Sequence, residues 1–191
     1  KPTATQAPKP TATQAPKPTA TSVPSPTPTE IPLNPTTILD SFGFKLLIDG
    51  VVTIENTGFI GTEANNDDGI VYFEYDGANS TLLWFEDDSS NLEDILFDSY
   101  NSIVEANQNL AFTLINQGDT DVESSQGKFL TYTSTNSEGA VQGGGLTGTW
   151  RCPAKESRKI PTVFSLTVTG ADPIVLQIRF KRLIDNFNCI P

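Results

Sequence analysis

Eight threonine hydroxyls near the N-terminus are the groups in this sequence most regularly spaced for a covalent modification. They lie in an octapeptide that occurs three times in the first 24 residues, as KPTATQAP, KPTATQAP and KPTATSVP, followed by the degenerate copy SPTPTEIP. Threonine beside proline and alanine is the composition of O-glycosylated stalks. We therefore expect O-linked glycans on Thr3, Thr5, Thr11, Thr13, Thr19, Thr21, Thr27 and Thr29.

Proline gives the same segment an extended conformation. Ten of the 14 prolines lie in residues 1–35, and each fixes its own φ and biases the preceding residue towards extended geometry. Polyproline II rises about 3.1 Å per residue with three residues per turn, so this stalk could reach roughly 100 Å. Because eight is not a multiple of three, successive repeats turn their threonines to different faces of the rod. A bare spacer without glycans is the alternative interpretation.

The two cysteines, Cys152 and Cys189, are the next reactive groups. They lie 37 residues apart, without a CxxC spacing, and no histidine is present to complete a zinc site. A disulfide is the favoured interpretation, and two buried free thiols are the alternative. A disulfide implies an oxidising compartment. No initiator methionine or signal peptide is present, so we expect the processed or partial form of a secreted precursor.

Acid–base chemistry depends on carboxylates here because the chain has no histidine. Ser-His-Asp, Cys-His and His-metal arrangements are therefore excluded. Carboxylate pairs could still support glycosidase-like hydrolysis, and the candidates are Glu74, Asp76, Glu86, Asp87 and Asp88. A charge run that borders a helix start more often caps the helix, so we expect no enzyme activity.

Two acidic loops offer oxygen ligands for calcium, at residues 65–69 and 119–123. Neither fits the twelve-residue EF-hand loop, and acidic turns before strands are common, so we expect no metal and no cofactor. Gly143, Gly144 and Gly145 lack the lysine and the following helix of a phosphate loop and indicate a turn or a bulge. The triplet Asn79-Ser80-Thr81 matches an N-glycosylation acceptor in a predicted turn.

Aromatic side chains near the middle of the chain could form a sugar platform if they face outward. The candidates are Tyr72, Tyr75, Trp84 and Phe85, which lie in two predicted strands. Because side chains alternate between the two faces of a strand, about half of them should be core, and core packing is the favoured interpretation.

Alternating hydrophobic residues predict the strands that must position these groups. Phe42, Phe44, Leu46 and Ile48 alternate up to Asp49-Gly50, so we expect a hairpin with residues 51–55. A second hairpin is expected between residues 70–75 and 81–86, across a turn at residues 76–80. Further strands are predicted at residues 110–115 and 127–135, and at residues 145–152 paired with 163–169.

Helical spacing replaces alternation in two places. Apolar residues from Leu92 to Val104 predict a helix that follows the capping residues Ser89, Ser90 and Asn91. Asp172-Pro173 opens a second helix, with an apolar stripe at Leu176, Phe180, Leu183, Ile184 and Phe187. The predicted fold of residues 36–191 is α+β, a mainly antiparallel sheet built from hairpins with both helices on one face.

This order of hairpins, helix, meander and a final helix ending in FKRLIDNFNC resembles the PsbP-like fold over residues 38–190. That fold occurs in small secreted or lipid-anchored domains behind Pro/Thr-rich linkers in bacterial surface proteins. The segments GTWRC and FNC depart from its plainest pattern and suggest a disulfide from the last meander strands to the terminal helix. The resemblance implies a non-catalytic function more often than an enzymatic one, and it transfers no site residues.

The stalk and the domain carry net charges of opposite sign, and the charge of the domain limits the classes of molecule that it could bind. Residues 1–35 carry three lysines and Glu30, whereas residues 36–191 carry nine basic and 22 acidic residues, a net charge of −13. So acidic a domain is poorly suited to nucleic acid or anionic membranes. No run of about 20 apolar residues occurs, so we expect no membrane span.

Together these patterns predict a non-enzymatic, extracellular or cell-surface structural glycoprotein. An O-glycosylated rod carries an acidic head, and copies of the chain associate into a surface fibre or coat. Residues 31–39 could add as a strand to a sheet edge of their own domain or of a neighbour. The alternative is a ligand-binding or sensor head displayed on a passive spacer.

Overall fold

A computed structural model of the 191-residue chain describes residues 35–154 and 160–190. These residues belong to one compact unit, Asn34–Pro191. The expected rod and all eight threonines of the stalk lie outside the described residues, so their conformation stays a prediction.

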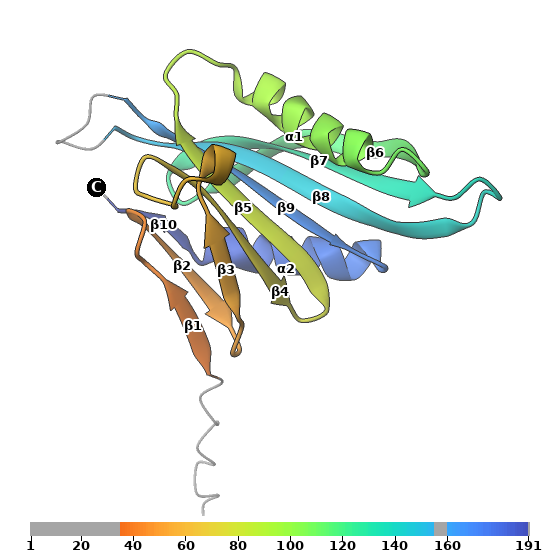
Figure 1. Ribbon diagram of the computed structural model, residues 1–191, viewed down its shortest axis with the longest axis horizontal. Coiled ribbons are helices and arrows are strands. Elements are labelled where there is room, and N and C mark those ends of the chain that lie inside the picture. Colours follow the sequence, from red (N-terminus) through yellow and green to blue (C-terminus); the bar gives the residue numbers. More distant parts are fainter. Residues whose placement is uncertain (1–34, 155–159, 191) are drawn as a thin grey trace, which may run out of the picture. The chain divides into compact units, whose positions relative to one another are not determined.

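The described residues of this unit form two antiparallel sheets and two α-helices, which confirms the α+β class (Figure 1). The larger sheet has the strand order β3-β4-β5-β9-β8-β7-β6, and the smaller has the order β1-β2-β10. The strands are β1 (Thr36–Leu39), β2 (Phe44–Asp49), β3 (Ile54–Thr57), β4 (Asp68–Tyr75), β5 (Ala78–Glu86), β6 (Ala111–Val122), β7 (Ser125–Thr135), β8 (Val141–Cys152), β9 (Thr162–Gly170) and β10 (Phe187–Cys189). The helices are α1 (Leu92–Ala106) and α2 (Pro173–Asp185), and a short 3-10 turn, η1, spans Phe59–Gly61.

Both helices begin where capping residues predict. The side chain of Asn91 accepts a hydrogen bond from the Glu93 amide at the start of α1. Asp172 accepts from the amides of Ile174 and Val175 at the start of α2, with Pro173 as the first helical residue. The second helix ends at Asp185, earlier than its apolar stripe suggests, because residues Phe187–Cys189 leave it to pair with β2.

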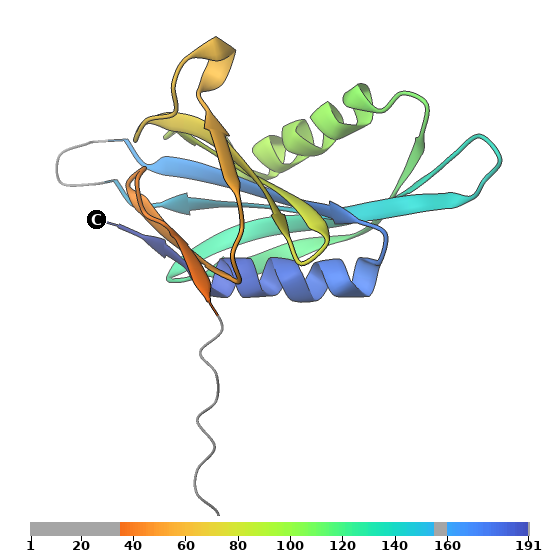
Figure 2. The ribbon, with the colours of Figure 1, turned by 60° about the horizontal axis from the view of Figure 1, so that its bottom comes forward.

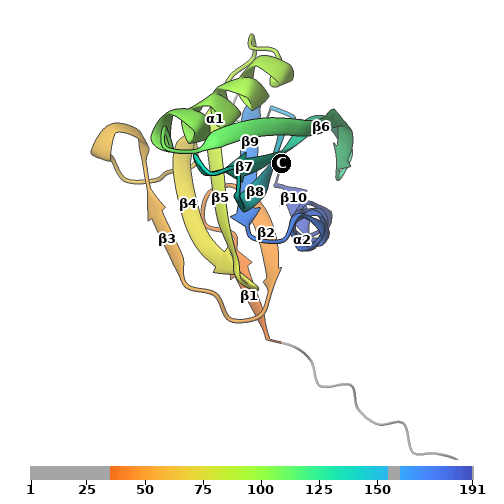
Figure 3. The same ribbon diagram turned by 90° about the vertical axis from the view of Figure 1, so that its right-hand side faces the viewer.

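The helices lie on opposite faces of the seven-stranded sheet, which corrects the prediction that they share one face (Figures 2 and 3). Neighbouring residues of β8 show this, since consecutive side chains of a strand point to opposite faces. The Thr149 hydroxyl donates to the Leu92 carbonyl of α1 at 3.0 Å. A Cβ added to Gly148 would lie 2.4 Å from Cζ of Phe180 in α2. Sequence periodicity identifies the apolar stripe of each helix but not the sheet face that the stripe covers.

The predicted hairpin at Asp49-Gly50 is wrong, although β2 itself is present. Its proposed partner strand, β3, pairs with β4 in the larger sheet, while β2 lies between β1 and β10. The Gly50 amide donates to the Pro35 carbonyl at 2.6 Å, and the Thr37 hydroxyl donates to the Gly50 carbonyl at 2.9 Å. The segment just before β2 therefore takes the edge that a hairpin would have used. The junction strand expected from residues 31–39 is β1, added to its own domain.

The main core lies between the seven-stranded sheet on one side and α2 with the small sheet on the other. Phe44 of β2 packs against Trp84, Phe164 and Phe187, with ring centroids 5.1 to 5.5 Å apart. Both tryptophans and Phe44 are fully buried there. The opposite face of the sheet carries a smaller cluster built by Leu96 of α1 with Leu130 and Tyr132 of β7. The molecule thus has one well-covered sheet face and one face covered by a single helix.

Candidate functional site

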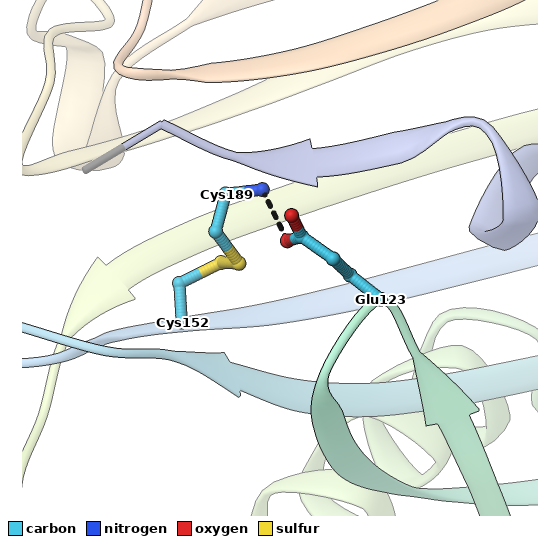
Figure 4. The surroundings of a disulfide bond; sticks show 3 residues. All are labelled: Glu123, Cys152 and Cys189. Atoms are coloured by element: carbon cyan, nitrogen blue, oxygen red, sulfur yellow. Dashed lines mark hydrogen bonds between the residues drawn. A yellow bond between two sulfur atoms is a disulfide. The ribbon is translucent and has the colours of Figure 1, made fainter.

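The two cysteines form a disulfide that joins the end of β8 to β10 (Figure 4). Their Cα atoms are 5.7 Å apart, within the usual range for a bridge. Cys189 lies on β10 rather than on the terminal helix, so the bridge ties the small sheet to the large one. The Glu123 carboxylate, in the β6–β7 turn, accepts a hydrogen bond of 2.9 Å from the Cys189 amide. This confirms the predicted pairing and gives it a structural function.

Two of the five carboxylates considered for acid–base chemistry, Asp87 and Asp76, are engaged in local structure. Asp87 accepts hydrogen bonds from the Ser89 and Ser90 amides at 2.8 and 3.0 Å in the turn before α1. Hydrogen bonds from the Ser90 hydroxyl and from these amides hold the pKa of the Asp87 carboxyl well below its usual range. Asp76 forms an ion pair with Arg179 of α2 at 2.9 Å. A carboxyl group whose pKa is lowered, as that of Asp87 is, is a poor general acid.

The two loops considered for calcium also have protein partners for several of their oxygens. Asn65 Oδ1 accepts from the amides of Asp67 and Asp68, which closes an Asx turn. Asp119 forms an ion pair of 2.5 Å with Lys128, and Glu123 accepts from Cys189. In residues 35–154 and 160–190, no three acidic or cysteine side chains are grouped so that they could hold a metal ion.

Two turn predictions around β5 and β8 have different outcomes. The β4–β5 hairpin turns at Asp76 and Gly77, both at positive φ, so Asn79-Ser80-Thr81 lies inside β5 and the predicted turn context is wrong. Gly143–Gly145 lie in β8, and the register to β7 shifts between Ser134 and Thr135. This confirms the bulge interpretation, with Gly143 at φ +154°.

The four aromatic residues considered for a sugar platform divide evenly between the two faces of the sheet. Trp84 and Tyr75 are buried in the main core, as the favoured interpretation predicts. Tyr72 is 43 % exposed, and Phe85 is half-buried on the face that carries α1. The two outward residues therefore contribute to a surface rather than to the core.

That surface is an open apolar groove of about 490 Å³ between α1 and the strands β4 and β5. It arises because α1 packs chiefly on β7, β8 and β9, so that the apolar side chains of β4 and β5 on this face are only half-buried. The sheet side of the groove is formed by four apolar or aromatic residues and three threonines, with Phe59 of η1 also in the lining. These residues are Ile70, Tyr72, Leu83 and Phe85, and Thr81, Thr167 and Thr169. Its helix side is formed by Ile95, Asp98, Ser99, Ser102 and Ile103.

The groove was not predicted, although the sequence holds a signal for it. Residues 82–85 are apolar at every position, and residues 70–73 are too, whereas a strand with one solvent-facing side alternates. Apolar runs of this kind indicate that both faces of the strand contact something. The structure shows that one face contacts the core and that the other lines the groove.

Among the described residues, Asp98 is the only charged side chain that lines the groove, and the Ser99 hydroxyl is already hydrogen-bonded to Ser165 of β9 at 2.9 Å. The groove thus offers mainly apolar contact, with the hydroxyls of serine and threonine and one carboxylate among its polar groups. Of the helices in the described part of the chain, neither is both long and apolar enough to cross a membrane.

Comparison with known proteins supports the fold and does not extend to a function. A scan against protein-family models and a search of curated proteins found no match. Among solved structures, the cyanobacterial PsbP (CyanoP) of Synechocystis sp. is similar at a TM-score of 0.58 and 13 % identity, covering 86 % of this chain and 97 % of that one. The fold is therefore PsbP-like.

Two further solved structures are more distant. The yeast Ran-binding protein Mog1p, from Saccharomyces cerevisiae, has a TM-score of 0.45 and 10 % identity, with 82 % of this chain and 96 % of that one covered. The immunity protein TplEi of Pseudomonas aeruginosa has a TM-score of 0.42 and 13 % identity, with 87 % and 58 % covered.

Proposed function

We propose that this chain is a non-enzymatic extracellular binding protein, in which the Pro/Thr segment displays an acidic α+β head. The head binds an uncharged amphiphile and holds the hydrocarbon part of that ligand in the groove between α1 and the strands β4 and β5. The observation that supports this most directly is the groove itself, which has a volume of about 490 Å³ and lies beside a helix whose main contacts are with β7, β8 and β9.

The lining supports a ligand with a hydrocarbon portion. Binding sites for small molecules are lined mainly by apolar and aromatic side chains with a few polar groups, and this groove has such a lining. Here the lining includes Tyr72, whose side chain is 43 % exposed. It also includes Phe59, which is followed in η1 by the fully exposed Ile60. Ile60 also adopts φ +56°, a left-handed conformation that isoleucine rarely takes.

Charge supports an uncharged ligand rather than an anionic one. The domain carries a net charge of −13, and the one charged side chain in the groove is the carboxylate of Asp98. A fatty acid or an anionic lipid would meet repulsion from both, and no lining cation compensates. A neutral head group avoids this penalty.

The extracellular location is supported by the disulfide, because such bridges persist in oxidising compartments. The Pro/Thr composition of residues 1–35 supports an extended spacer, and its threonines are the proposed glycan acceptors. Intact-mass measurement of the secreted protein tests this: a mass equal to that of the polypeptide would contradict the glycans.

A neutral detergent, n-octyl tetraethylene glycol ether, tests the groove when it is titrated below its micelle concentration and followed by isothermal calorimetry. Ser102→Trp places an indole at the groove from an exposed helix position, and we expect it to weaken binding at least tenfold. Asn101→Trp is the matched control, because Asn101 is the adjacent exposed residue of α1 and does not line the groove. Equal binding by both variants, or no binding by the unmodified protein, would contradict the proposal.

A second proposal is that copies of the chain associate into a fibre or coat, and β6 supports it. This twelve-residue strand ends the seven-stranded sheet, so its outer edge has no neighbouring strand within the described part of the chain. Ile115, in the irregularity between Leu114 and Asn116, is 61 % exposed. A long exposed edge can pair with another chain.

Sedimentation velocity and electron microscopy of the full chain separate the two proposals. If β6 mediates assembly, Ile115→Lys should convert the assemblies to monomers without reducing detergent binding. A chain that stays monomeric at high concentration would contradict the fibre and leave the binding head intact. Association that survives Ile115→Lys would exclude this edge as its cause.

A further inference from the structure

A second cavity, of about 320 Å³, lies beside the C-terminal end of α1 and continues the groove. The two share Ile103 of α1 and Thr169 of β9 in their linings. The second cavity differs in character, because most of its functional groups are amides and hydroxyls. These belong to Asn79, Asn107, Tyr132, Ser134, Gln142 and Thr169.

Tyr132 is the most unusual of these residues. Its side chain is 3 % exposed, and its hydroxyl has no hydrogen-bond partner in the described part of the chain. A buried hydroxyl without a partner costs free energy and usually has a specific explanation. Burial raises the pKa of this hydroxyl, so it remains a protonated donor at neutral pH. The hydroxyl oxygen is itself buried, so a ligand in the cavity would supply the missing acceptor only after the side chains that cover this hydroxyl have moved.

The backbone around Tyr132 leaves space for its ring. A Cβ at Gly145 would lie 2.2 Å from the Tyr132 hydroxyl, so only glycine leaves room for the ring over β8. The bulge that precedes it places Gln142 at the cavity and Gly143 at φ +154°. Phe112 of β6 completes the aromatic side, with its ring centroid 5.7 Å from that of Tyr132.

Two of the amides are held in place by the chain and retain hydrogen-bonding capacity. Asn107 Nδ2 donates to the Ile103 carbonyl at 2.8 Å, and Gln142 Nε2 donates to the Ala140 carbonyl at 3.3 Å. Each amide group has two donor hydrogens and a carbonyl acceptor, so further bonds remain possible. No lining side chain carries a charge at neutral pH.

These features lead us to propose that the second cavity binds a neutral sugar, the head group of the amphiphile whose hydrocarbon part lies in the groove. Amides that both donate and accept match the adjacent hydroxyls of a sugar, and an aromatic ring offers a flat apolar surface to its C–H face. A charged head group would find no counter-charge in the cavity. The inference rests on the proposed function, since the groove provides the tail contact.

Two neutral detergents with the same tail separate the head-group contribution from the tail contribution. These are n-octyl β-glucoside and n-octyl tetraethylene glycol ether, each titrated below its micelle concentration into the full chain. We expect the glucoside to bind at least fivefold more tightly, the effect of about one additional hydrogen bond. Tyr132→Phe combined with Gln142→Ala should remove that preference and leave the affinity for the ether unchanged. Gln177→Ala, an exposed glutamine on α2, is the control and should preserve the preference.

The outcomes distinguish the two proposals. Equal affinity of the unmodified protein for both detergents would overturn the proposed sugar site and leave the proposed binding of the tail in the groove unaffected. A preference that survives the Tyr132 and Gln142 substitutions would also overturn it. Failure to bind either detergent would refute both proposals, the binding of a hydrocarbon tail in the groove and the binding of a sugar in the second cavity. Thermal unfolding of the double variant checks the fold, and Tyr132→Phe should not lower stability because it removes an unpartnered hydroxyl.

Discussion

Removing the Cys152–Cys189 disulfide should destabilise the head by an amount that follows from the length of the loop it closes. The two residues are 37 apart, and the bridge is the covalent link between β8 and β10. The chain-entropy relation for a loop of this length gives about 4 kcal/mol at 25 °C. Unfolding entropy of about 2.1 cal/mol/K per residue converts this into a fall of roughly 12 °C in Tm for a domain of this size.

The measurement is urea unfolding of the oxidised protein and of the Cys152→Ser/Cys189→Ser variant at pH 7, followed by tryptophan fluorescence. Trp84 and Trp150 are both fully buried, so the signal reports the core. Reductant should lower the stability of the unmodified protein and leave the variant unchanged. A loss of unfolding free energy below about 1 kcal/mol would contradict this prediction, because the entropy of the closed loop would then not be the main contribution of the disulfide to stability.

Three further predictions concern named contacts. Gly148→Ala places a Cβ 2.4 Å from Cζ of Phe180 and should cost about 1–3 kcal/mol in urea unfolding, because α2 must shift; a neutral effect would contradict the packing. Arg179→Ala should cost less than about 1 kcal/mol in the same assay, since its partner Asp76 is 69 % exposed, and a large loss would assign the ion pair a greater role. The pKa of Asp87 is lowered in the folded state, so its contribution is present above the unfolded pKa of about 4 and is lost as pH falls below it. The difference in urea midpoint between the unmodified protein and Asp87→Asn should therefore stay constant from about pH 7 to about pH 5 and shrink as the pH falls from about 5 to about 3, and a constant difference over the lower range would contradict this prediction.

The sequence correctly predicted those parts of the fold that depend on interactions between residues close together in the chain. Asn91 and Asp172 cap the two helices because a side chain hydrogen-bonds amides two or three residues away. The β4–β5 hairpin follows from two apolar runs around Asp76-Gly77. The α+β class and the strands β7, β8 and β9 follow from the same periodicities.

Pairings between distant residues could not be predicted in this way. Asp49-Gly50 has the composition of a hairpin turn, but β1 competes for the same edge of β2, and β3 pairs with β4. Cys189 lies on a strand rather than on the helix because Phe187 enters the main core and pairs across β2. In each case the free energy gained by burying a remote side chain exceeds the local preference.

By itself, the sequence determined the octapeptide composition, the absence of histidine, the acidity of the domain, the periodicity of its helices and strands, and the favoured pairing of its two cysteines. Only the tertiary structure decided that α1 and α2 cover opposite sheet faces, as Thr149 and Gly148 show. That arrangement leaves the groove between α1 and the strands β4 and β5, and a second cavity whose lining includes both Tyr132 and Gln142. The physical reason is that periodicity specifies which side of an element is apolar, whereas its partner is selected by packing among residues far apart in the chain.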